Sequence, residues 1–297
     1  MFVFYLINNI ETGECVMPLV QMKGILIKAN EENYGVGAFS VANMEMVMGA
    51  IKAAEELRSP LILQIAEVRL NHSPIHLIGP LMVAAAKKAT VPVAVHFDHG
   101  MTFEKIKETL EIGFSSVMFD GSHYPLEENI QKTKEIVELA KQYGATVEAE
   151  IGRVGGSEDG LEDIEMLLTS TKEAKRFAEE TDVDTLAVAI GNAHGMYNGN
   201  PDLRLDRLQE INEVVRIPLV LHGGSGISPE DFKQCIQHGV RKINVATATF
   251  QNVITAVNTA VGNAPYSDYF TYHQDVIDAA YENVKNHISI FGSENRA

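Results

Sequence analysis

The feature that most constrains the fold is a regular alternation of short apolar segments with longer amphipathic segments along the chain. Continuous runs of Val, Ile, Leu and Ala are typical of the buried strands of parallel sheets. Eight such strands are expected: one ending at Ser40, and then residues 60–66, 91–97, 115–120, 145–151, 184–190, 217–223 and 240–246. Helical periodicity lies between them, as at 20–30, 44–57, 103–112 and 126–143. The pattern predicts an α/β fold in which strands and helices alternate.

Eight is the number of strands that closes a (β/α)8 TIM barrel. The competing architecture is an open, doubly wound sheet, but no predicted strand is followed by G-x-G-x-x-G opening a helix. Polar residues also follow nearly every strand, whereas an open sheet would gather them at one switch point. We therefore predict a single-domain TIM barrel over residues 17–297, with residues 1–16 as an N-terminal extension.

Composition narrows the classes of partner. The chain has 24 Lys and Arg residues against 40 Asp and Glu residues, a formal net charge of −16. That balance argues against nucleic acid and against a membrane surface as partners, although a nest of backbone N–H groups can still hold a small phosphate. We also expect no signal peptide and no membrane span. The two cysteines, Cys15 and Cys235, have no metal-site spacing, so a cytoplasmic location is expected.

Polar residues at the strand ends are where chemistry is expected, because the C-terminal ends of barrel strands meet at one mouth. These residues are His96, Asp98, His99, Asp120, Ser122, His123, Glu148, Glu150, Asn192, His194, His222, Asn244 and Thr247. Three imidazoles from different strand ends, His99, His194 and His222, could hold a catalytic zinc and leave a coordination position open. Each histidine alone would more often be a hydrogen-bonded structural residue, so the metal interpretation depends on their convergence.

Glycine-rich loops indicate a phosphate site and a flap. GNAHG at 191–195 and HGGSG at 222–226 follow late strands, where barrel enzymes often bind phosphate with backbone N–H groups. The alternative for HGGSG is a tight turn before the helix that begins near Ser228 and Pro229. GRVGGSEDG at 152–160 has the composition of a mobile flap that could bring Glu158 over a substrate. An ordinary solvated acidic loop is the alternative there.

Five motifs occur in order along the chain: HFDHG, EAEIGRVGGSEDG, AIGNAHG, LVLHGGSG and KINVAT. In order and separation they resemble those of the class II, zinc-dependent ketose-bisphosphate aldolases of the fructose and tagatose type. The resemblance extends over residues 17–297 and includes the closing FGSENR. It implies a lyase that reversibly cleaves a ketose (bis)phosphate into dihydroxyacetone phosphate and an aldehyde through a metal-stabilised enediolate.

The resemblance also implies a metal centre. His99, His194 and His222 match the zinc ligands of the family. Glu150 matches a carboxylate that contacts the metal in an alternative position. Three neutral imidazoles would leave the zinc ion its double charge, and a Lewis acid of that charge stabilises an enediolate anion.

Acid/base and substrate-binding roles are implied in the same way. Asp98 matches the acid/base that serves the hydroxyl made from the aldehyde carbonyl, and Glu158 matches the base that deprotonates dihydroxyacetone phosphate. The positions that match binding of the triose and its phosphate are Gly195, Gly223, Gly224, Ser225, Asn244 and Thr247. Relatives hold a monovalent cation, Na+ or K+, near Gly195 and Gly223, and they are homodimers or homotetramers.

Four positions depart from the pattern usual in the family: Ser40, Ala66, Ala246 and Phe250. Phe250 replaces a basic residue that in some relatives reaches the distal phosphate, and Ala246 stands where fructose-type members often carry Asp. All four positions belong to the aldehyde end, so we expect the triose half to be retained and the aldehyde partner to differ, for example by lacking its phosphate. Two alternatives stay open: another zinc barrel enzyme such as a hydrolase, and a non-catalytic metal- and phosphate-binding protein.

Overall fold

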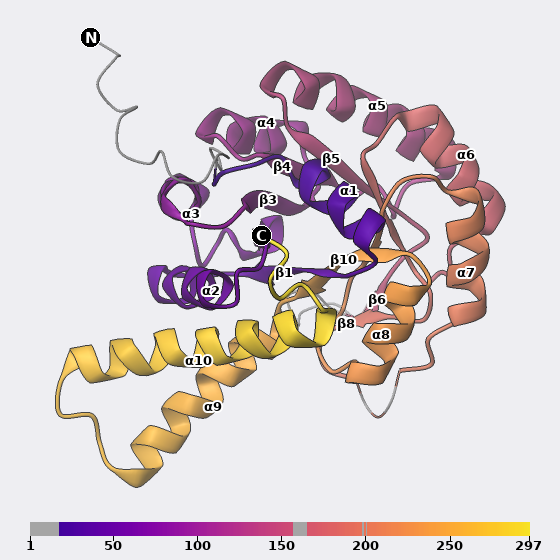
Figure 1. The fold of residues 1–297 in the computed structure, drawn as a ribbon. Helices are drawn as coiled ribbons and strands as arrows, with labels where there is room; N and C mark the ends of the chain where they lie inside the picture. Colours follow the sequence, from indigo (N-terminus) through magenta and orange to yellow (C-terminus); the bar gives the residue numbers. More distant parts are fainter. Residues whose placement is uncertain (1–17, 157–164, 198, 200) are drawn as a thin grey trace, which may run out of the picture.

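The computed structural model describes residues 18–156, 165–197, 199 and 201–297, and its centre is a closed barrel of parallel strands (Figure 1). The barrel strands are β1 (Val36–Ser40), β2 (Leu61–Ala66), β3 (Val93–Gly100), β4 (Ser116–Phe119), β5 (Thr146–Ile151), β7 (Thr185–Val188), β9 (Leu219–Leu221) and β10 (Val240–Val245). Around the barrel they lie in the order β1-β10-β9-β7-β5-β4-β3-β2. The predicted (β/α)8 barrel is confirmed. Two further short strands, β6 (Gly155–Gly156) and β8 (Ala193–His194), pair with each other outside the barrel and were not predicted.

Helices between the strands form the outer layer of the barrel. They are α2 (Met44–Glu56), the 3-10 turn η1 (Glu67–Arg69), α3 (Ile75–Lys88), α4 (Phe103–Ile112), α5 (Leu126–Tyr143), α6 (Thr171–Thr181), α7 (Leu205–Val214) and α8 (Pro229–Gln237). Local sequence determines where they begin. Ser228 Oγ accepts a hydrogen bond from the backbone N–H of Asp231, as N-cap residues do, and Pro229 occupies the first helical position. The helix predicted after HGGSG is thus confirmed.

The N-terminal end of the barrel is closed by α1 (Met22–Glu32). Met22 and Leu26 of this helix are fully buried. They belong to an apolar cluster that contains Ile62 and Ala94 from neighbouring barrel strands. Burying side chains of this size stabilises a fold by about 1.5–3 kcal/mol each. The site must therefore open at the other end, where the strands end in polar residues.

The barrel interior above α1 is polar. Side chains alternate along a strand, so Lys242 and Asn244 of β10 share one face. Glu148 and Glu150 of β5 share a face in the same way. His96 belongs to β3, which is two strands from β5 around the barrel. These five side chains are at most 5% exposed. An apolar floor thus supports a polar layer that leads to the mouth of the barrel.

The last two helices, α9 (Thr247–Asn263) and α10 (Tyr269–Phe291), form a hairpin that extends away from the barrel (Figure 1). The C-terminal part of the hairpin is anchored on α2. Gly49 of α2 permits a close crossing, because an added Cβ would lie 2.5 Å from the carbonyl oxygen of Ile277. Within the described ranges, no helix has both the length and the apolar character needed to cross a membrane.

Candidate metal and phosphate site

Strand β3 ends in an irregularity that presents two adjacent residues to the mouth of the barrel. Its pairing with β4 shifts register between Phe97 and Gly100, as at a β-bulge. Within this bulge, His99 has a left-handed φ of 46°, a conformation that costs a non-glycine residue on the order of 1–3 kcal/mol. The distortion lets Asp98 face the barrel interior while the ring of His99 reaches other histidines.

The three predicted ligand histidines converge at this mouth. The ring centroid of His99 lies 4.9 Å from that of His194 and 4.6 Å from that of His222, and the last two are 5.9 Å apart. One ring nitrogen from each histidine lies within 4.8 Å of the others, close enough for one metal ion to be shared. His194 is held in place by the β6–β8 pair, in which it lies opposite Gly156. The structure brings the three side chains together as expected, while their role as ligands stays a prediction.

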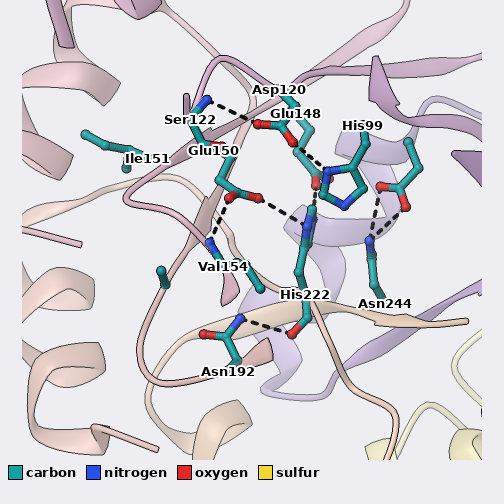
Figure 2. A network of polar contacts seen from close by, with 12 residues as sticks. His99, Asp120, Ser122, Glu148, Glu150, Ile151, Val154, Asn192, His222 and Asn244 are labelled. Atoms are coloured by element: carbon teal, nitrogen blue, oxygen red, sulfur yellow. Dashed lines mark hydrogen bonds and ion pairs between the residues drawn. The ribbon is translucent and has the colours of Figure 1, made fainter. Parts of the chain in front are cut away.

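Carboxylates orient two of these rings (Figure 2). His99 Nδ1 lies 2.7 Å from Asp120 Oδ2, and His222 Nε2 lies 2.9 Å from Glu148 Oε1. Metal-ligating histidines usually donate one ring N–H to such an acceptor, which leaves the other nitrogen for the metal. The remaining nitrogen of His222, Nδ1, is buried and makes no hydrogen bond to any residue that the structure describes. This donor set, with two imidazoles anchored by carboxylates, fits a divalent ion such as zinc.

Glu150 lies beside the same centre. Its Oε2 is 3.3 Å from His222 Nδ1, and its Oε1 accepts a hydrogen bond from the backbone N–H of Val154. Glu150 also forms a second group of potential ligands with His99 and Asp120, again with atoms within 4.8 Å of one another. The expected alternative metal position is therefore geometrically available. Glu158 lies outside the described residues.

The buried charges at the mouth shift one another's protonation. Burial lowers the pKa of His222, but its contacts with the carboxylates of Glu148 and Glu150 outweigh burial and raise the pKa to about 9. Burial would raise the pKa of Asp98, but neighbouring imidazoles and Lys242 hold that pKa well below its usual range. Burial and the nearby ammonium of Lys242 lower the pKa of His96 to about 3, so His96 is neutral. Because its pKa lies well below the usual range, Asp98 is a carboxylate at neutral pH.

A small pocket lies beside His194 at the mouth. It is lined by Gln64, Asp98, His194, Gly195, Gly223, Ser225, Asn244, Ala246 and Thr247. The pocket contains the N-terminus of α9, whose preceding residue Ala246 provides no side-chain cap. Helix N-termini favour anions because their first N–H groups lack intrahelical partners and the helix dipole is positive there. Five of the six predicted substrate-binding residues thus line one anion-compatible pocket.

Two adjacent glycines shape the pocket wall differently. Gly223 has a φ of +65°, and an added Cβ would lie 2.1 Å from the carbonyl oxygen of Ala193, so the loops after β7 and β9 meet closely there. Tyr197 Oη links the same loops by donating to Gly223 O and accepting from the Ala193 N–H. Gly224 is not among the lining residues. Its N–H donates to Asn244 O at 3.0 Å, so its expected contact with phosphate has a competing partner.

The sequence alone assigned no role to several groups that organise the site. Lys242 is fully buried and lies 2.9 Å from Glu148 Oε2. Gln64 Nε2 donates to Asp98 Oδ2 at 2.9 Å, and Asp120 orients His99 as described above. A signal was present for Lys242, because a lysine stood two positions before Asn244 in an otherwise apolar strand.

Comparison with known proteins identifies the family. The family described as fructose-bisphosphate aldolase class-II matches residues 20–296. The chain belongs to this family. Class-II aldolases are lyases and are generally metal-dependent, in agreement with the convergent histidines. Membership covers the barrel and the C-terminal hairpin alike.

Individual relatives cover the chain almost completely. The fructose-bisphosphate aldolase of Staphylococcus aureus is 40% identical over 285 residues, which is 95% of this chain and 100% of the relative. That of Staphylococcus epidermidis is 39% identical over 287 residues, with the same coverage. The crystal structure of the YdjI aldolase from Escherichia coli K12 matches with a TM-score of 0.85 at 35% identity, covering 94% of this chain and 99% of that one.

Proposed function

We propose that this class-II aldolase is a zinc-dependent enzyme that reversibly cleaves a ketose phosphate or bisphosphate, of the fructose or tagatose 1,6-bisphosphate type, into dihydroxyacetone phosphate and an aldehyde. The observation that carries the proposal is the convergence of His99, His194 and His222 beside a pocket at the N-terminus of α9. A divalent-ion site next to an anion-binding helix end suits a substrate with both a ketone and a phosphate.

The metal and the carboxylates divide the work. Zinc held by the three histidines would supply a Lewis acid that polarises the substrate ketone. Glu158 is the proposed base for the carbon-bound proton of dihydroxyacetone phosphate. Asp98 is the proposed acid/base at the aldehyde oxygen, because its buried carboxylate lines the pocket and accepts hydrogen bonds from Gln64 and Asn244 that favour the anion. In the cleavage direction Asp98 therefore accepts the hydroxyl proton, and in synthesis it returns that proton.

The phosphate is proposed to bind without a strong cation from the chain. Ser225 Oγ accepts the N–H of Ala248 in the first turn of α9, so its own hydroxyl hydrogen is directed elsewhere and can reach a phosphate. Gly195 and Gly223 line the pocket and have positive φ angles, a conformation that glycine adopts readily and that lets the backbone come close to a ligand. We place a monovalent cation, Na+ or K+, near these two glycines, where it would offset the phosphate charge. Assays in potassium, sodium and tetramethylammonium salts test this placement.

The aldehyde end supports a changed partner. Ala246 lines the same pocket as Asp98. Ser40 Oγ accepts from Gln64 Nε2, which also donates to Asp98, so two of the four departures lie near the acid/base. Phe250 lies under the guanidinium of Arg69, at 5.4 Å from ring to guanidinium. We propose that the aldehyde lacks a phosphate. Kinetics with glyceraldehyde 3-phosphate against unphosphorylated aldehydes tests this. A strong preference for the phosphorylated aldehyde would refute the proposal and would suit binding of its phosphate by the guanidinium of Arg69.

A panel of ketose 1-phosphates and ketose 1,6-bisphosphates, assayed for cleavage with zinc and with a chelator, tests the main proposal. Release of dihydroxyacetone phosphate that depends on zinc is expected. Proton exchange on dihydroxyacetone phosphate, followed by NMR in heavy water, separates the aldolase from a zinc hydrolase, which would not need this substrate. Zinc binding without exchange would instead indicate a metal- and phosphate-binding protein that lacks catalysis.

We also propose a homodimer or homotetramer in the cytoplasm. The α9–α10 hairpin carries exposed apolar side chains, including Ile254, Val261, Tyr269 and Phe270, with 50–76% of each exposed. Large exposed apolar groups on a projecting element are typical of subunit interfaces. Light scattering of the wild type and of Phe270→Asp tests the assembly. The buried free thiol of Cys235 is compatible with a reducing compartment.

A further inference from the structure

A fully buried ammonium lies at the centre of the barrel. Lys242 Nζ is 3.1 Å from Glu148 Oε1 and 2.9 Å from Glu148 Oε2. It also donates to Asn244 Oδ1 at 2.7 Å. Burying an ion is costly unless its hydrogen bonds are satisfied, and here each partner accepts from the same ammonium. Each partner in turn leads to a different part of the proposed active site.

The first branch runs through Glu148 to the metal centre. With Lys242 on one side, the carboxylate of Glu148 is fixed so that Oε1 accepts from His222 Nε2 at 2.9 Å. A proton held on Nε2 leaves the lone pair on Nδ1, which is the nitrogen that lies 3.3 Å from Glu150 Oε2. The ammonium therefore helps to select the ring orientation and tautomer that can bind a metal.

The second branch runs through Asn244 to Asp98. An amide side chain can flip, so which end faces a neighbour depends on its partners. Lys242 can only donate, and it therefore holds Oδ1 of Asn244 toward itself. Nδ2 is then directed at Asp98, 3.1 Å from Oδ1 and 3.2 Å from Oδ2. Without the ammonium, a flipped amide would present its oxygen to the carboxylate and turn Asp98 away from the pocket.

We infer that Lys242 is a positioning residue that orients a metal ligand, His222, and the acid/base, Asp98, through one ammonium. The inference rests on the proposed aldolase function for its Asp98 branch, whereas its His222 branch requires only metal binding. A purely structural lysine would neutralise Glu148 and affect stability alone. Replacing a positioning lysine must also change the affinity for the metal and the rate of cleavage relative to the rate of proton exchange on dihydroxyacetone phosphate.

The test compares Lys242→Met, Glu148→Gln and the double variant Lys242→Met/Glu148→Gln, with Lys107→Met as the control. Lys107 is an exposed lysine of α4 whose Nζ lies 3.7 Å from Glu111 Oε1, one turn further along the helix. The double variant removes both buried charges, so it stays interpretable if the single lysine variant fails to fold. Circular dichroism and thermal melts establish folding. Zinc affinity is measured by chelator competition. At saturating zinc, cleavage of the ketose substrate and proton exchange on dihydroxyacetone phosphate are measured side by side.

Lys242→Met should weaken zinc binding about 10-fold or more, as is typical when a partner of a metal ligand is lost. In both Lys242 variants the ratio of cleavage to exchange should fall about 10-fold or more, because exchange does not use Asp98. Glu148→Gln should weaken zinc binding but keep that ratio. Folded Lys242 variants with zinc affinity and ratio equal to those of Lys107→Met would overturn the inference. A wild type that binds zinc but cleaves no ketose phosphate would refute the proposed function, and zinc affinity would still decide the role of Lys242.

Discussion

Replacing Asp120 by Asn is the sharpest single test of the metal centre. Asp120 Oδ2 accepts from His99 Nδ1 at 2.7 Å, and its Oδ1 accepts from the backbone N–H of Ser122 at 3.1 Å. Both partners are donors if His99 offers its other nitrogen to a metal ion. Asparagine has one carbonyl oxygen, so its NH2 group must face one of these two donors. The variant therefore disturbs either the metal-competent tautomer of His99 or the turn at Ser122.

The size of the effect follows from that mismatch. A buried donor left without an acceptor costs about 1–3 kcal/mol. The substitution also removes the negative charge of Asp120, which makes the imidazole of His99 a stronger ligand. Loss of such a carboxylate partner typically weakens metal binding about 10–100-fold, which corresponds to about 1.4–2.8 kcal/mol. We expect the zinc Kd of Asp120→Asn to rise within this range.

Chelator competition measures the Kd, and Asp184→Asn is the matched control. Asp184 Oδ2 also accepts a backbone N–H, from Val147 at 2.9 Å, and its Oδ1 pairs with Lys23 at 2.7 Å. Asp184 directly precedes β7, at the N-terminal end of the barrel strands and away from the histidines. This control should lose thermal stability and bind zinc like the wild type. If a folded Asp120→Asn protein also bound zinc like the wild type, His99 would not be a ligand oriented by Asp120.

Three further predictions concern pH, proton transfer and the backbone. Without metal the pKa of His222 is raised to about 9, so the ring is protonated below that pH. Zinc binding should therefore release about one proton near pH 7, and zinc affinity should rise about tenfold per pH unit up to about pH 9. Calorimetry in two buffers measures the proton release, and finding none would contradict this prediction. Glu158→Gln should lose proton exchange and cleavage by about 10²–10⁴-fold, whereas Asp98→Asn should lose cleavage and keep exchange; equal loss of exchange in both would refute the division of roles. Gly223→Ala should lower the free energy of unfolding by about 1–3 kcal/mol, because Cβ would meet the Ala193 carbonyl at a left-handed φ, and an unchanged thermal melt would show that the loop moves instead.

The barrel and the meeting of the histidines could be predicted from the sequence because topology does most of the work. Eight buried parallel strands can close in few ways, and their C-terminal ends then share one mouth. His99 lies at the C-terminal end of β3 and His222 directly follows β9, so their proximity needed no knowledge of side-chain geometry. Where that rule held, prediction and structure agree.

The rest depended on local distortions and on pairings across the barrel. Strict alternation would have sent either Asp98 or His99 away from the site, and the bulge that brings both to it has no signature in HFDHG. The β6–β8 pair that holds His194 consists of two residues on each side, too short for a periodic signal. The contacts of Lys242 reach Glu148, 94 positions earlier in the chain, and no local pattern encodes that separation.

The polar layer inside the barrel divides the protein into two regions with unequal freedom to change. Between strands and helices, aliphatic residues such as Leu63 and Val95 can be exchanged for others of similar volume at a cost typically below about 1.5 kcal/mol. Inside the barrel, removing one member of a buried ion pair typically costs about 3–5 kcal/mol, because the other charge is left stranded. Homologues and engineered variants should therefore drift in the outer shell while the interior changes only through compensated, simultaneous substitutions.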